Sequence, residues 1–256
     1  MVISMIFYFT ATGNTQYAAE RIAEATGDRL VSVGQALRSG SYEYDVTGDG
    51  YLGFAAPTFA GTLPGAVGLF LDRLKLTGYG GQFVYGVFTC GASDGFESAA
   101  LYTVLKNRGI DFNGSYELVM PDNFIVWSDI PSGARLGAIL ERADRRLDEI
   151  AAAIKGKRPG KVDARAPQQL YMPLSEVSAA GNTGALHADG KCTACGLCAE
   201  ICPMGCIRRD GDGRPVWDGS CTMCLACLHR CPAAAVQHGR DTQNKARYVH
   251  PKVKFI

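Results

Sequence analysis

Histidine is scarce in this sequence, and none precedes residue 187. The four histidines are His187, His229, His238 and His250. Histidine is the side chain that most often moves protons near neutral pH. A catalytic acid or base built on histidine is therefore excluded from the first 186 residues.

Long apolar runs and a strong charge imbalance are also missing. No apolar run approaches the roughly 20 residues of a membrane-spanning helix, and residues 2–9 lack the basic flank of an export signal. The 256 residues carry a formal net charge of +1, which gives no sign of nucleic-acid binding. We therefore expect a cytoplasmic protein with no membrane span and no nucleic-acid partner.

Two glycine-rich nucleotide motifs are absent from the loop that follows the first predicted strand. Residues 10–15 carry neither the G-x-x-x-x-G-K-[ST] motif of P-loop proteins nor the G-x-G-x-x-G motif of dinucleotide folds. Without the P-loop motif, hydrolysis of a nucleoside triphosphate is disfavoured. Without the dinucleotide motif, this loop lacks the usual dinucleotide-binding turn.

Short apolar runs alternate with segments of helical period from residue 1 to about residue 154. This alternation predicts an α/β domain with a parallel sheet covered by helices on both faces. For a domain of this size, the natural arrangement is a flavodoxin-like, doubly wound, five-stranded sheet of order 2-1-3-4-5. The expected strands are residues 2–9, 29–33, 51–55, 83–88 and 115–119, and the expected helices are residues 15–25, 64–74, 95–108 and 132–154.

The second half of the chain divides differently. Turn-forming residues replace the helical period after residue 154, which indicates a linker. We expect a first domain at residues 1–160, a linker at 161–185, a small α+β domain at 186–240 and a tail at 241–256. Up to residue 180 there are 16 basic and 19 acidic residues, whereas the remainder has 10 and 6. The basic excess either offsets negative charge that this part of the chain would hold or forms a docking face for an acidic partner.

Eight of the ten cysteines lie in two short runs. The pattern C-x2-C-x2-C-x3-C-P begins at Cys192 and again 29 residues later, at Cys221. Such a loop presents three thiolates to three corners of a [4Fe–4S] cluster, and the fourth must come from elsewhere. Zinc fits less well, because structural zinc takes its ligands in two pairs. A disulfide framework fits less well again, because nothing marks the chain for export.

This spacing is typical of bacterial ferredoxins with two [4Fe–4S] clusters. That resemblance implies that the last cysteine of each run ligates the cluster of the other run. Cys206 aligns with Ala235 of the second run, so we expect it to be a packing residue, and we expect His229 at the surface. The implied ligands are Cys192, Cys195, Cys198 and Cys231 for one cluster, and Cys221, Cys224, Cys227 and Cys202 for the other.

A second chemical site follows the first predicted strand. The sequence Thr10-Ala-Thr-Gly-Asn-Thr15 leads into a helix, where hydroxyls and backbone N–H groups favour an anion. The alternative is an ordinary helix start capped by threonine. The T-x-T-G-N-T pattern resembles the FMN phosphate loop of flavodoxins, whose neutral Thr and Asn side chains coordinate a monophosphate. That resemblance implies a phosphate site formed by Thr10, Thr12, Gly13, Asn14 and Thr15.

Two further loops leave the carboxyl ends of strands, where a doubly wound sheet binds its ligand. They combine glycines, which let the backbone approach a flat ring, with polar groups for the pyrimidine edge of a flavin. Phe59 either stacks on the flavin or packs beneath its loop, and Trp127 is a second candidate. Cys90 either touches the flavin or is a buried thiol. The predicted ring-binding residues are Pro57, Thr58, Phe59, Ala60, Gly61, Thr89, Cys90, Gly91 and Gly95.

With both sites in place, the chain resembles proteins of anaerobes in which an N-terminal flavodoxin-like domain is fused to a C-terminal two-cluster ferredoxin domain. The resemblance also includes Met120-Pro-Asp-Asn123 and the terminal Arg247-Tyr248 and His250-Pro251. The loop after the fourth strand lacks the tyrosine that covers the second flavin face in many flavodoxins. The implied cofactors are FMN and two [4Fe–4S] clusters.

Such a fusion would connect one-electron clusters to a two-electron flavin. We therefore expect an electron-transfer protein that relays electrons between its clusters and FMN, with a ferredoxin-type donor or an acceptor reductase as its redox partner. One alternative is an FMN-dependent reductase of a small organic acceptor, fed by its own clusters. Another is a structural or sensory cluster protein. The sequence by itself does not choose between an electron carrier and an enzyme.

Overall fold

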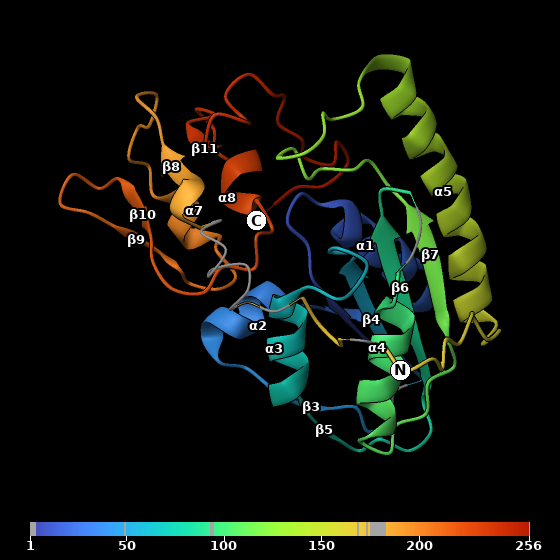
Figure 1. Ribbon diagram of the computed structural model, residues 1–256. Coiled ribbons are helices and arrows are strands. Elements are labelled where there is room, and N and C mark those ends of the chain that lie inside the picture. Colours follow the sequence, from blue (N-terminus) through green and yellow to red (C-terminus); the bar gives the residue numbers. More distant parts are fainter. Residues whose placement is uncertain are drawn as a thin grey trace.

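The computed structural model describes residues 4–48, 50–92, 95–167, 169–172, 174 and 183–255. Three predicted segments include residues outside this set. They are Val2 and Ile3 of the first predicted strand, Ser93 and Asp94 between the predicted ring-binding residues Gly91 and Gly95, and part of the predicted linker. A helix-covered sheet and a smaller module rich in loops pack side by side (Figure 1). The smaller part, residues 186–240, is called the C-terminal module below.

Five parallel strands form the central sheet, in the order β2-β1-β4-β6-β7. Every neighbouring pair is parallel. Numbered along the chain, this is the order 2-1-3-4-5, so the flavodoxin-like doubly wound fold is confirmed. The order reverses between β1 and β4, which places the topological switch point there. The strands are β1 (Met5–Tyr8), β2 (Arg29–Ser32), β4 (Tyr51–Pro57), β6 (Phe83–Cys90) and β7 (Ser115–Val119).

Helices cover both faces of the sheet because successive strand residues point to opposite sides. In β1, Met5 and Phe7 join one core, whereas Ile6 joins the other. Helices α1 (Asn14–Thr26) and α5 (Gly133–Lys155) cover the Ile6 face. The opposite face is covered by α2 (Val33–Ser39), α3 (Gly65–Arg73) and α4 (Glu97–Lys106) (Figure 1).

Helix α2 is absent from the sequence-based prediction, which extends the second strand through Val33. In the structure the strand ends at Ser32, whose side chain accepts a hydrogen bond from the Gln35 N–H at 3.3 Å. This capping bond starts a short helix where the apolar run alone favours a strand. A small parallel pair, β3 (Glu43–Asp45) and β5 (Lys75–Thr77), lies outside the main sheet.

The C-terminal module is built around two short antiparallel pairs and two one-turn helices. Strand β8 (Leu186–Ala188) follows a 3₁₀ turn, η1 (Thr183–Ala185), and pairs with β11 (Val236–His238). Strands β9 (Ile207–Arg209) and β10 (Pro215–Trp217) form a hairpin. The helices are α7 (Leu197–Glu200) and α8 (Ala226–His229).

The sequence repeat of the C-terminal module reappears in its backbone. Left-handed residues occur at 194 and 223, at 196 and 225, and at 205 and 234. Each pair has the 29-residue offset of the cysteine runs. The two cysteine loops therefore share one backbone path.

The module and the sheet domain interlock. Ile125, in the loop after β7, is fully buried within the core of the C-terminal module. In the other direction, Cys224 and Ala226 of the module belong to the core beneath the sheet. The loops at the carboxyl edge of the sheet are thus fixed against the cysteine loops.

Candidate functional site

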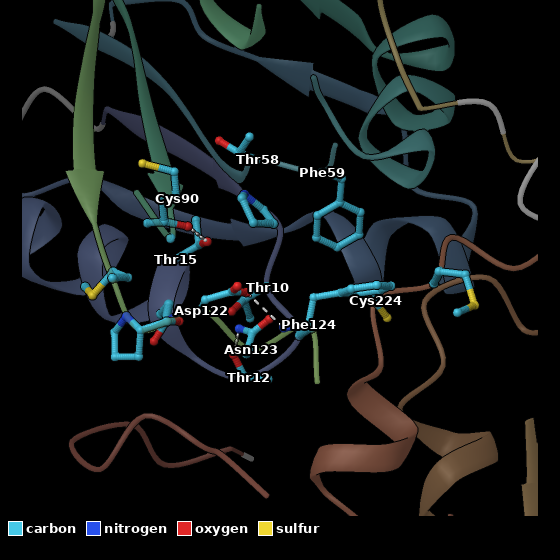
Figure 2. Close-up of a pocket in the computed structure, with 18 of the residues that line it drawn as sticks. Thr10, Thr12, Thr15, Thr58, Phe59, Cys90, Asp122, Asn123, Phe124 and Cys224 are labelled. Atoms are coloured by element: carbon cyan, nitrogen blue, oxygen red, sulfur yellow. Dashed lines mark hydrogen bonds between the residues drawn. The ribbon is translucent and has the colours of Figure 1, made fainter. Parts of the chain in front are cut away.

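A cavity of about 1000 Å³, counting its open side, lies at the carboxyl edge of the sheet. We call it the edge cavity. Its walls come from the loops after β1, β4, β6 and β7 and from one cysteine loop (Figure 2). Ligand sites of doubly wound folds lie at this edge. The lining residues predicted from the sequence are Thr10, Thr12, Asn14, Thr15, Pro57, Thr58, Phe59, Ala60, Thr89, Cys90, Gly91 and Trp127.

The loop between β1 and α1 presents an uncapped helix N-terminus to this cavity. Gly13 is the N-cap residue and no side chain caps the helix. The first backbone N–H groups of an α-helix have no partner within the helix, so those of Asn14 and Thr15 remain for an anion. Thr15 shares a 2.7 Å hydrogen bond with Thr89, and Thr12 accepts one from Asn123 at 2.7 Å.

The Asn14 side chain is used differently from the expectation that it binds phosphate. Its Nδ2 donates to the Pro121 carbonyl at 3.0 Å, and its Oδ1 accepts from the Tyr248 hydroxyl at 2.8 Å. Both ends of the amide therefore bond to protein. The Asn14 side chain therefore fixes the loop, and only its backbone N–H is left for an anion.

The loop after β4 is a tight turn that carries Phe59. Ala60 and Gly61 both have positive φ, and Phe59 and Thr62 exchange backbone hydrogen bonds across them. Gly95 packs on this turn, because a Cβ there would lie 2.1 Å from the Gly61 carbonyl oxygen. Gly61 and Gly95 thus shape the wall without lining it, and Gly13 also lies behind the cavity surface.

A buried hydroxyl in this loop lacks a partner. Thr58 Oγ1 has no hydrogen-bond partner among the described residues, although Thr58 lines the edge cavity. Buried polar atoms are nearly always satisfied in folded proteins. An unsatisfied hydroxyl within the wall of a cavity fits a polar ligand edge such as that of a flavin.

The loop after β7 contributes more residues to the wall of the edge cavity than the sequence predicted. Asp122 accepts hydrogen bonds from the Phe124 N–H and the Ser128 hydroxyl. Phe124 packs edge-to-face against Trp127 at 5.0 Å, and Trp127 is 82% exposed at the rim. The lining residues that the prediction omitted are Ala11, Met120, Pro121, Asp122, Asn123, Phe124, Met172, Thr222, Met223 and Cys224.

Two smaller cavities lie within the C-terminal module, and each is walled by cysteines from both runs. The inner cysteine cavity lies beside the edge cavity, and the outer one lies nearer the surface. Each includes the crossed-over fourth ligand that the ferredoxin resemblance implies. The inner set is Cys202, Cys221, Cys224 and Cys227, and the outer set is Cys192, Cys195, Cys198 and Cys231.

The groups around these cavities indicate what each could hold. Within the described ranges, no three His, Cys, Asp or Glu side chains converge closely enough to share one metal ion. At the inner cavity, the buried indole N–H of Trp217 donates toward the Cys227 thiol, which opposes the rise that burial gives the pKa of that thiol. A buried donor at the wall of a thiolate-lined space fits the sulfur atoms of a [4Fe–4S] cluster.

The two cysteine cavities differ in exposure. All four cysteines of the inner set are buried, whereas Cys195 is exposed and the other three of the outer set are half-buried. Burial raises the pKa of the Cys224 thiol, and it does so for Cys227 as well. Backbone N–H groups that donate to the cysteine sulfurs partly compensate for burial. Met223, for example, donates its N–H to Cys221 Sγ at 3.2 Å.

Cys206 was expected to be a packing residue, and it lies next to the inner set. Its Sγ is 3.6 Å from that of Cys202, and it lines the inner cavity. His229 also differs from expectation. It was expected at the surface but is 3% exposed, because its ring bridges the Asn123 carbonyl, 2.7 Å from Nε2, and the Tyr248 N–H, which donates to Nδ1.

Comparison with known proteins identifies part of the C-terminal module. Residues 189–208, which contain the first cysteine run, match the family of 4Fe-4S binding domains. This part of the C-terminal module is therefore similar to 4Fe-4S binding domains. No curated protein sequence matches this chain.

Several solved structures resemble the sheet domain. Rubredoxin oxygen:oxidoreductase from the anaerobe Desulfovibrio gigas is 18% identical, with a TM-score of 0.38, over 60% of this chain and 36% of that protein. Two-electron reduced flavodoxin from Megasphaera elsdenii is 19% identical, with a TM-score of 0.36, over 59% and 98%. A flavodoxin from Streptococcus pneumonia TIGR4 is 18% identical, with a TM-score of 0.36, over 59% and 99%. The fold is defined by the strand order rather than by these likenesses.

No helix among the described residues is long and apolar enough to cross a membrane.

Proposed function

We propose that this chain relays electrons between two [4Fe–4S] clusters and an FMN. The inner and outer cysteine sets would each hold one cluster, and the edge cavity would hold the FMN. Each cluster carries one electron and FMN carries two, so the assembly would connect one-electron and two-electron partners. The cofactor sites would fall in residues 1–160 and 186–240, joined by residues 161–185 and followed by the tail at 241–256.

One observation carries this proposal. Thr222, Met223 and Cys224 line both the edge cavity and the inner cysteine cavity. The inner cluster and the flavin would therefore share a single wall of three consecutive residues. In Figure 2, Cys224 lies beside Phe59 and Phe124 at one end of the edge cavity.

The contrast in exposure supports an order for the relay. Cys195 of the outer set is exposed, whereas the inner set is buried and its cavity shares a wall with the edge cavity. A redox partner would reach the outer cluster first. Electrons would then pass through the inner cluster to the FMN, and the reverse path would serve a flavin-reducing partner.

The protein's own groups support FMN in the edge cavity. The N–H groups at the start of α1 would bind the phosphate, and no lysine or arginine lines the cavity among the described residues. Phe59 and Phe124 would lie against the ring, and the Thr58 hydroxyl would meet its polar edge. Asp122, the one carboxylate in the described part of the wall, is engaged by Phe124 and Ser128, so it holds the loop rather than supplying a proton.

An anaerobic reductive titration tests the relay directly. The flavin absorbance and the paramagnetic cluster signal are followed together, and the electrons taken up per chain are counted. We expect uptake of about four electrons, two by FMN and one by each cluster. Uptake near two, with no flavin spectrum, would leave a two-cluster ferredoxin on an empty sheet domain and would refute the proposal.

A further inference from the structure

The C-terminal tail returns to the N-terminal end of helix α1. The His250 N–H donates to the Thr12 carbonyl at 2.8 Å. The Tyr248 hydroxyl donates to Asn14 Oδ1 at 2.8 Å, across 234 residues of sequence. Tyr248 and His250 are 4% and 2% exposed, so these contacts are shielded from water.

The tail packs directly on the loop that would bind the phosphate. A Cβ placed on Gly13 would lie 3.0 Å from the His250 Cβ and 3.2 Å from the Val253 Cβ. Asn14, held between Tyr248 and the Pro121 carbonyl, cannot turn its side chain into the anion site. The loop is thereby fixed with the N–H groups of α1 facing the edge cavity.

The tail itself is anchored on both sides of these contacts. On one side, the His250 ring stacks on Tyr17 at 4.2 Å, and Lys252 pairs with Asp144 at 2.7 Å. On the other side, the Tyr248 N–H donates to Nδ1 of His229, in helix α8 of the C-terminal module. The loop conformation therefore depends on a segment that follows the second cysteine run.

We propose that Tyr248 and His250 are positioning residues for the FMN phosphate, because they hold residues 10–15 in the conformation that receives it. This inference rests on the proposed binding of FMN. A loop ordered before binding saves the entropy that ordering during binding would cost. The effect is specific to the phosphate, because neither residue lines the cavity that would hold the ring.

Two flavins that differ by one group make the test. FMN carries the phosphate and riboflavin lacks it, so the ratio of their affinities reports on the phosphate loop alone. Removing one buried hydroxyl with Tyr248→Phe should weaken FMN binding about fivefold to tenfold. His250→Ala should weaken it as well, through loss of the Tyr17 stack. In both variants, riboflavin affinity and iron content should stay unchanged.

Tyr51→Phe is the matched control. Its hydroxyl donates to the Lys155 carbonyl at 3.0 Å, away from the edge cavity, so FMN affinity should be kept. Unchanged FMN affinity in both tail variants would overturn the inference, and so would an equal loss of FMN and riboflavin binding. If the wild-type protein bound both flavins equally well, the phosphate site of the proposed function would itself be wrong. The two failures are therefore distinguishable.

Discussion

Gly13 is the residue at which backbone conformation and tail packing meet. Its φ of +100° lies where side chains are strained, and a Cβ there would lie tightly against His250 and Val253 of the tail. Gly27 ends the same helix with a φ of +79°, but a Cβ placed on it would meet no described atom within 4 Å. The two glycines therefore separate backbone strain from local crowding.

We expect Gly13→Asp to weaken FMN binding by about 100-fold or more, because it adds a carboxylate beside the phosphate and displaces His250. Gly27→Asp should lower the free energy of unfolding by about 1–2 kcal/mol and leave FMN affinity unchanged. Flavin fluorescence quenching measures the affinity of both variants. Retention of FMN by Gly13→Asp would contradict the loop assignment.

The loop after β7 connects the wall of the edge cavity with the core of the C-terminal module. Asp122 and Asn123 face the edge cavity, whereas Ile125 is fully buried among residues of the C-terminal module. Val126, the next residue, is only partly buried there. This one segment therefore contributes both to a ligand wall and to the packing of the cysteine loops.

Ile125→Ala should destabilise the protein by about 2–5 kcal/mol, the usual cost of such a truncation in a packed core. Val126→Ala should cost clearly less, because part of its side chain already faces solvent. Denaturation followed by cluster absorbance would measure both. Equal losses in the two variants would show that Ile125 does not connect the cores.

At the scale of the whole molecule, the repeat provides a matched pair of cluster variants. Cys198 and Cys227 are equivalent residues 29 positions apart; the first lines the outer cavity and the second the inner one. Cys206 lines the inner cavity without belonging to the predicted ligand set. Substituting each thiol in turn tests which of the proposed clusters would pass electrons to the proposed flavin.

Cys198→Ser and Cys227→Ser should each lower the iron content from about eight to about four atoms per chain, while Cys206→Ala should leave it unchanged. With a low-potential protein donor, Cys227→Ser should show a reduced outer cluster beside an oxidised flavin. Rapid flavin reduction in Cys227→Ser would show that electrons reach the flavin without passing through the inner cluster. Loss of iron in Cys206→Ala would mean that the ligand set is wrong.

Local patterns in the sequence predict the sheet, because strand alternation and helical period are short-range properties. They do not predict the contacts that complete the site. Tyr248 and Asn14 meet across most of the chain, and no periodicity marks either residue. His229 lies in a one-turn helix between two cysteines, so its burial is decided by Asn123 and Tyr248 rather than by its neighbours in sequence.

The left-handed positions of the two cysteine loops record how the repeat diverged. The first half of the repeat uses Gly196 and Gly205, which adopt positive φ without strain. The second half has Leu225 and Ala234 at the same places, at a cost of roughly 1–2 kcal/mol each. Leu225 is 3% exposed within the core of the module. At this position the first half keeps a permissive glycine and the second half places a packed leucine, so the two halves of the repeat are not interchangeable.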